Sequence, residues 1–146
     1  MKRRSERMQR VADLAESRSD EAARILGEHQ RALREAESQL EELGRFRKEY
    51  ETMAPGQGVT VAEMLNRQRF VHRIDQAMTQ QRSEIQRRRQ SVEGARARWL
   101  EVRNRHAALD SVTRRYRNQE ERAEERRDQE AVDERSQHRR GGPGHD

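Results

Sequence analysis

The chain has 146 residues, of which 40% are charged and 30% hydrophobic, with 3% aromatic residues and a net charge of +5. This composition leaves too little apolar surface for a compact core, but it suffices for the narrow apolar stripe of a coiled coil. Cysteine is absent, which excludes disulfides and thiol chemistry, and no apolar run reaches the ~20 residues of a transmembrane helix.

Residues 1–7 are basic and lack the apolar segment that follows in a secretory signal, so we expect a tail there. From about residue 8 to residue 53, apolar residues recur at alternating spacings of three and four, which predicts a first long helix. Its most regular seam consists of Ala22, Leu26, His29, Leu33, Ala36, Leu40, Leu43, Arg47 and Tyr50. Gly27 and Gly44 lie inside this helix and indicate either a close backbone approach or a tolerated weakness.

A run of helix breakers, Ala54-Pro55-Gly56-Gln57-Gly58, interrupts the pattern, and we assign residues 54–60 to a turn. Thr60 and Glu63 have the spacing of a capping box, in which the threonine hydroxyl accepts a hydrogen bond from the Glu63 amide. The box predicts that a second helix begins near residue 61 and continues to about residue 136. Residues 137–146 are glycine-rich, and we expect a disordered tail there.

The second helix carries the longest regular seam of the chain. It runs through Val71, Ile74, Met78, Gln81, Ile85, Arg88, Val92, Ala95, Trp99, Val102, His106, Leu109, Thr113, Tyr116, Glu120 and Ala123. Two such helices joined by a short turn predict an all-α fold, a long antiparallel two-helix coiled-coil hairpin over residues 8–136 of a monomer.

The pairing of the two helices follows from the place of the turn. If the turn centres near residue 57, Leu43 faces Val71 and Ala36 faces Met78, so that seam positions meet along the hairpin. The first helix then ends opposite residue 106. The remainder of the second helix is therefore expected to form a C-terminal overhang.

No catalytic constellation is present, so an enzyme is not expected. No phosphate-binding loop motif occurs, and the five histidines lack the spacing of metal ligands, so we expect no cofactor, metal or small-molecule ligand. Acidic and basic residues are interspersed, as is typical of solvated helix faces. Nucleic acid is therefore not an expected partner, although a basic coiled-coil nucleic-acid-binding protein or a plain structural coiled coil remains an alternative.

A second stripe overlaps the start of the long seam. Phe70, Ile74, Ala77 and Gln81 fall at i, i+4, i+7 and i+11, which places them on one face of a helix. Phe70 is one of only two phenylalanines in the chain. The stripe is a candidate protein-docking surface; in the alternative interpretation, Phe70 folds back onto the turn or onto Phe46.

Several segments resemble the flagellar FliJ family of the bacterial type III export apparatus. The resemblance covers nearly the whole chain, in the order Asp13-Leu14-Ala15-Glu16, residues 20–28, Glu49-Tyr50, Phe70 with Ile74 and Ala77, Trp99, Asp128-Gln129-Glu130 and Asp133-Glu134. It implies a two-helix coiled coil similar to the stalk of the F1 ATPase. It also implies a non-enzymatic adaptor at the cytoplasmic face of the cell membrane at the flagellar base.

The partners implied by the resemblance are the export ATPase hexamer, the cytoplasmic domain of the export-gate membrane protein, and export chaperones. The gate-docking positions of the family correspond to Phe70, Ile74, Ala77 and Gln81, although the family pattern has histidine at the last of these. By analogy with the stalk, the helix ends and the overhang would face the ATPase. The equivalent stalk of a virulence type III secretion system is the alternative with the same fold.

Overall fold

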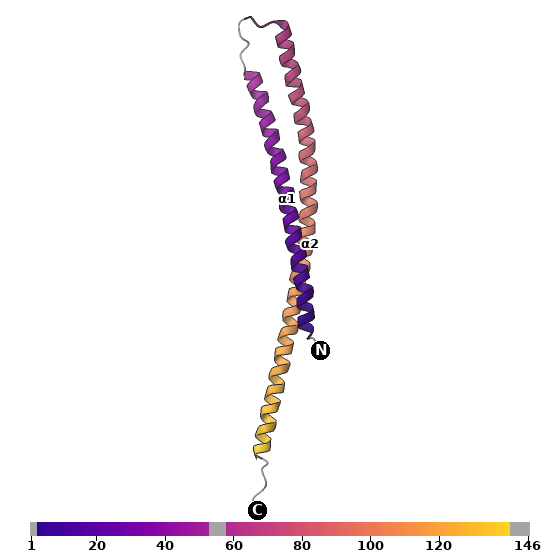
Figure 1. Cartoon of the computed structure of the whole chain (residues 1–146), viewed down its shortest axis with the longest axis vertical. Coiled ribbons are helices and arrows are strands. Elements are labelled where there is room, and N and C mark those ends of the chain that lie inside the picture. Colours follow the sequence, from indigo (N-terminus) through magenta and orange to yellow (C-terminus); the bar gives the residue numbers. More distant parts are fainter. Residues whose placement is uncertain (1–2, 53–57, 141–146) are drawn as a thin grey trace, which may run out of the picture. The chain divides into compact units, whose positions relative to one another are not determined.

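The computed structural model describes residues 3–52 and 58–140, and these residues form two long helices. Helix α1 spans Arg4–Thr52 and helix α2 spans Val61–Arg140, and the two run in opposite directions (Figure 1). The expected all-α antiparallel hairpin is therefore confirmed. Helix α1 begins about one turn before residue 8, and α2 continues beyond residue 136; the expected tail from residue 141 onward lies outside the described residues.

The start of α2 is capped by Thr60. The Glu63 amide donates a hydrogen bond to the Thr60 hydroxyl at 3.2 Å, as the capping-box spacing predicts. The Met64 amide donates to the Thr60 carbonyl at 3.1 Å and begins the helical hydrogen-bond ladder. Just before the cap, Gly58 has a φ of 91°, a backbone conformation that glycine adopts without steric cost. Residues 54–57 of the expected turn lie outside the described residues.

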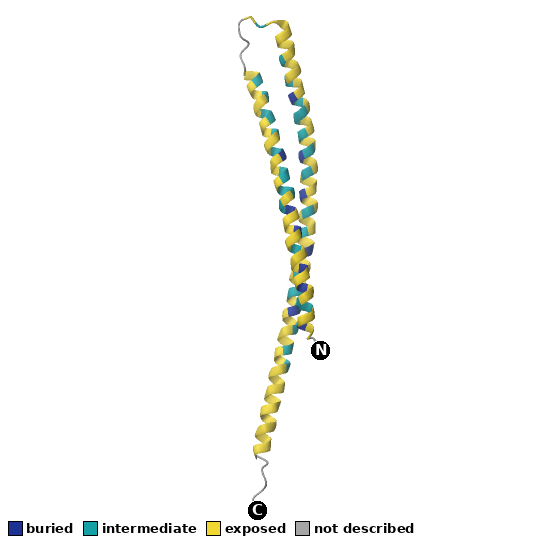
Figure 2. Ribbon diagram, viewed as in Figure 1, coloured by how far each residue is buried: buried dark blue, intermediate teal, exposed yellow. Residues whose placement is uncertain are grey.

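The chain divides into two units, of which the larger spans residues 20–101. Its core is a single apolar stripe from both helices. The buried members are Ala22, Leu26 and Ala36 of α1 and Ile74, Ile85 and Val92 of α2. They occupy predicted seam positions, and Figure 2 shows the buried positions on the facing sides of the helices. Removing this stripe from water stabilises the pair by about 25 cal/mol per Å² of apolar surface.

Of the described residues, the second unit contains 3–19, which include the start of α1, and 102–140 of α2. Ala12 and Ala15 are buried in it, as are Val102 and Thr113 of α2. Thr113 is only 1% exposed, and its hydroxyl donates to the Leu109 carbonyl at 2.8 Å, so the buried oxygen is satisfied.

The register of residues 20–101 differs from the expected one. Ala36 was expected to face Met78, but its carbonyl accepts a hydrogen bond from Gln81. Met78 instead lies beside Gly44, where an added Cβ would be 3.9 Å from the Met78 Cε. The α2 residues that contact α1 therefore lie further along the chain than expected, by about one heptad. The expected register was wrong because a seam of period seven matches itself again after seven residues.

The overhang of α2 also starts later than expected. Ser5 hydrogen-bonds to Glu120 and Arg3 forms an ion pair with Glu124, so α1 covers α2 well beyond residue 106. The side chains of residues 124–139 are all exposed. Within this unit the overhang therefore begins near residue 124, and it consists almost entirely of polar and charged residues.

Candidate protein-docking surface

Phe70 is the most prominent residue of the predicted stripe. Phe70 is 41% exposed, so part of the residue is accessible to solvent. Its ring stacks on Tyr50 of α1, with ring centroids 4.3 Å apart and an angle of 26° between the planes. Phe70 thus folds back onto α1 at Tyr50, whereas Phe46 is itself 47% exposed. The stack holds the ring in one orientation while leaving part of it accessible.

The next two stripe residues point more toward α1. Ile74 is 6% exposed and belongs to the apolar core of the hairpin. Ala77 is half-buried at the edge of that core. Ala77 therefore stays partly accessible, while Ile74 packs in the core between the two helices.

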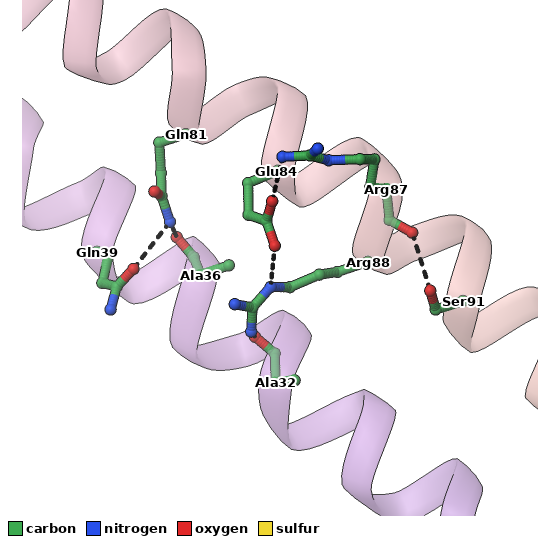
Figure 3. Close-up of polar contacts among 8 residues, drawn as sticks. All are labelled: Ala32, Ala36, Gln39, Gln81, Glu84, Arg87, Arg88 and Ser91. Atoms are coloured by element: carbon green, nitrogen blue, oxygen red, sulfur yellow. Dashed lines mark hydrogen bonds and ion pairs between the residues drawn. The ribbon is translucent and has the colours of Figure 1, made fainter.

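Gln81 is held by polar contacts to α1, as Figure 3 shows. Its Nε2 donates to the Ala36 carbonyl at 2.9 Å and to the Gln39 Oε1 at 3.0 Å. Both donor positions of the amide are therefore directed at α1, and the residue is half-buried. The structure places the four predicted residues along the boundary between α1 and α2, with Phe70 exposed, Ile74 buried, and Ala77 and Gln81 half-buried.

Charged groups flank this boundary. The Arg47 guanidinium donates hydrogen bonds to the Asp75 carboxylate, and this hydrogen bonding is the main reason that the pKa of Asp75 lies below its ordinary value of 3.8. Arg67 donates to the backbone carbonyl of Tyr50 near the end of α1. Asp75, Arg67 and Tyr50 also line a shallow depression of about 470 Å³ with Glu51, Gln68, Val71 and His72. The surface beside Phe70 thus combines an apolar ring with a mixed polar border.

Sequence reasoning missed an exposed apolar group at the start of α2. Val61, Met64 and Leu65 are 74%, 55% and 47% exposed. The missed signal was the spacing of Met64, which lies seven residues before Val71 and so continues the long seam toward the turn. In the observed register the described part of α1 ends before it can cover Met64.

The remaining chemistry of the described residues is limited. No group of three or more His, Asp or Glu residues among them is placed to hold a metal ion. Neither helix, over its described residues, has a stretch that is long and apolar enough to cross a bilayer. The carboxylates Glu21, Glu84 and Asp75 accept hydrogen bonds from neighbouring arginines.

Comparison with known proteins identifies the family of the chain. The family model described as "Flagellar FliJ protein" matches residues 4–143. The chain is 34% identical to the flagellar FliJ protein of Escherichia coli (strain K12) over 127 residues, which cover 85% of this chain and 86% of the relative. It is 32% identical to that of Salmonella typhi over 130 residues, which cover 87% and 88% of the two chains. The chain therefore belongs to the flagellar FliJ family.

Proposed function

We propose that the chain is a non-enzymatic stalk and adaptor of bacterial flagellar type III protein export. In this role it links the export ATPase hexamer to the cytoplasmic domain of the export-gate membrane protein and handles export chaperones. It would act in the cytoplasm, at the membrane face of the flagellar base. Membership of a flagellar family supports this role over that of a stalk in a virulence secretion system.

The observation that carries the gate-docking part of the proposal is the partial exposure of Phe70. Large aromatic side chains that are held rigidly and remain accessible are common anchors of protein interfaces. Phe70 meets both conditions, because Tyr50 fixes one side of its ring while the residue stays 41% exposed. Ala77, two helical turns further along α2, leaves room for a partner side chain. Ile74 and Gln81 would act by holding this part of α2 against α1.

A second surface is required for the ATPase, and the overhang of α2 is the segment that we assign to it. Residues 125–139, which follow the Arg3–Glu124 ion pair, are exposed helix. Acidic and basic side chains are interspersed along this segment, which suits a charged protein surface better than an apolar groove. The gate and the ATPase would therefore bind at different surfaces of the same chain.

The test is a pull-down of the chain with two baits, the gate's cytoplasmic domain and the export ATPase. Phe70→Ala should weaken gate binding by more than about 1 kcal/mol and leave ATPase binding unchanged. Phe46→Ala is the matched control, because it removes the other exposed phenylalanine, which lies on α1. Equal gate affinity for Phe70→Ala and the unmodified chain would remove the docking assignment. Failure of the unmodified chain to bind either bait would overturn the proposed role.

A further inference from the structure

A row of arginines borders the apolar seam of α2. Arg82, Arg89 and Arg96 recur at every seventh position, and all three are exposed. Each of them lies four residues after a seam residue, as Arg89 lies after the buried Ile85, so the three share one edge of the helix. At ~1.5 Å per residue, successive arginines lie about 10 Å apart along α2.

This arginine row lies on the opposite side of the seam from the candidate docking surface. Phe70 and Ala77 each come one residue before a seam residue, whereas each arginine of the row comes four residues after one. On a helix of about 3.6 residues per turn, these two offsets fall on the two flanks of the seam. The arginine row is therefore a separate surface, and what binds there is independent of the proposed export role.

Helix α1 does not neutralise the arginine row. Charged residues that border a seam normally pair across the helices and so determine which helices associate. Among the described residues, however, Arg82 and Arg89 form no ion pair, and Arg96 pairs with Glu93 of its own helix at 3.0 Å. The side chains of that pair stay 48% and 71% exposed, so the pair adds little stability and is readily exchanged. This edge of α2 thus keeps its charge available to another molecule.

The carboxylates beside the arginine row on α2 are already engaged. Residues 82–98 contain six arginines and two glutamates, so this segment carries a net charge of +4 in a chain of +5. Glu84 accepts hydrogen bonds from both Arg87 and Arg88, as Figure 3 shows, and Glu93 accepts one from Arg96. A molecule that binds the row therefore has to bring carboxylates or other anionic groups of its own.

The geometry of the row favours an acidic helix over a nucleic acid. A helix that lies along α2 presents a carboxylate about every 10 Å if Asp or Glu recurs at every seventh position, which matches the arginines one to one. The phosphates of a duplex wind around its axis with a turn of about 34 Å, so they soon leave a straight row. Binding of single strands depends on aromatic stacking, and residues 82–98 contain no aromatic residue.

We propose that Arg82, Arg89 and Arg96 form a docking row for an acidic helical segment of another protein, in which Asp or Glu recurs at heptad spacing. Each guanidinium offers a carboxylate two parallel charge-assisted hydrogen bonds. The spacing of the partner's acidic residues, rather than their number, then determines whether it binds. Because the ion pairs are exposed, binding weakens as the salt concentration rises.

Fluorescence anisotropy with two labelled acidic peptides tests the proposal on the full chain. Both peptides are stapled helices of the same composition. One carries glutamate at every seventh position, and the other has the same glutamates distributed around the helix. The first peptide should bind more tightly at low ionic strength. A row variant that combines Arg82→Gln, Arg89→Gln and Arg96→Gln should bind it at least about tenfold more weakly, because three exposed ion pairs are lost.

The matched control removes the same charge from positions of α2 outside the row, through Arg73→Gln, Arg87→Gln and Arg98→Gln, which are also exposed. The control should change the affinity for the first peptide by about twofold or less, since it alters only the screened charge of the surroundings. Circular dichroism checks that both triple variants remain helical. Arg89→Gln alone repeats the measurement with the least disturbance of the chain.

Three outcomes would overturn the docking row. They are equal binding of the two peptides, an equal loss in the two triple variants, and failure of the unmodified chain to bind the first peptide. A duplex oligonucleotide and vesicles of anionic phospholipid are measured in parallel. Tighter binding of either one that is lost in the row variant would overturn a protein helix as the occupant.

Discussion

The Tyr50 and Phe70 rings stack with their centroids 4.3 Å apart and join the last turn of α1 to the early part of α2. Arg67 strengthens the same junction by donating to the Tyr50 carbonyl. Phe70 therefore has a structural partner within the chain and an exposed side for another molecule. Substitutions at this position must be interpreted for both roles.

The ring stack should contribute to the stability of the hairpin. A double-mutant cycle of Tyr50→Ala and Phe70→Ala should give a coupling free energy of about 0.5–1.5 kcal/mol, the usual range for aromatic pairs. Urea unfolding followed by circular dichroism provides the four free energies of unfolding. Additive effects of the two substitutions would contradict a stabilising stack.

The buried stripe should carry most of the packing energy of residues 20–101. Ile85 is 4% exposed, so Ile85→Ala should lower the free energy of unfolding by about 2–5 kcal/mol through lost burial and a cavity. Leu100→Ala is the matched control, because Leu100 is 42% exposed and its truncation should cost about 0.5 kcal/mol or less. Similar losses for both variants in urea unfolding would argue against the observed burial pattern.

The helix glycines should be replaceable with a gain in stability. A Cβ added at Gly27 or Gly94 would have no heavy atom within 4 Å, so neither glycine serves a close helix approach. Gly27→Ala and Gly94→Ala should each raise the free energy of unfolding by about 0.5–1 kcal/mol. Gly58→Ala should instead destabilise, because the φ of 91° at this position strains any side-chain-bearing residue. Thermal unfolding of the three variants measures the contrast.

Acid should weaken the contact between Ser5 and Glu120. The Glu120 carboxylate accepts hydrogen bonds from the Ser5 hydroxyl and from its amide at 3.2 Å, and the hydroxyl bond is the main reason that the pKa of Glu120 lies below its ordinary value of 4.5. A carboxyl group whose pKa is lower in the folded chain than in the unfolded chain stabilises the fold at pH values above its ordinary pKa. This stability is lost as the pH falls through the lowered pKa.

Ser5→Ala tests this contact. The melting temperature of Ser5→Ala should lie below that of the unmodified chain at neutral pH, and the difference should shrink as the pH falls to about 3. Ser17→Ala is the control, since Ser17 is an exposed serine of α1. A difference that is independent of pH would assign the effect of Ser5 to packing alone.

The sequence by itself determined the two helices, the cap and the seam. Each of these depends on neighbours in the chain: the three-four spacing of apolar residues defines a helix face, and Thr60 reaches the amide of Glu63 three residues later. The family resemblance was also readable from residues in order along the chain. These features were therefore predictable without knowledge of the other helix.

The tertiary structure decided the register and the accessibility of the candidate surface. A seam that repeats every seven residues fits its partner equally well after a shift of seven, so apolar spacing cannot choose between the two positions. Contacts across the helices, such as Gln81 with Ala36, choose between them. They also determine that Ile74 is buried while Phe70 keeps an exposed side, because the burial of a stripe on α2 depends on which α1 residues lie opposite.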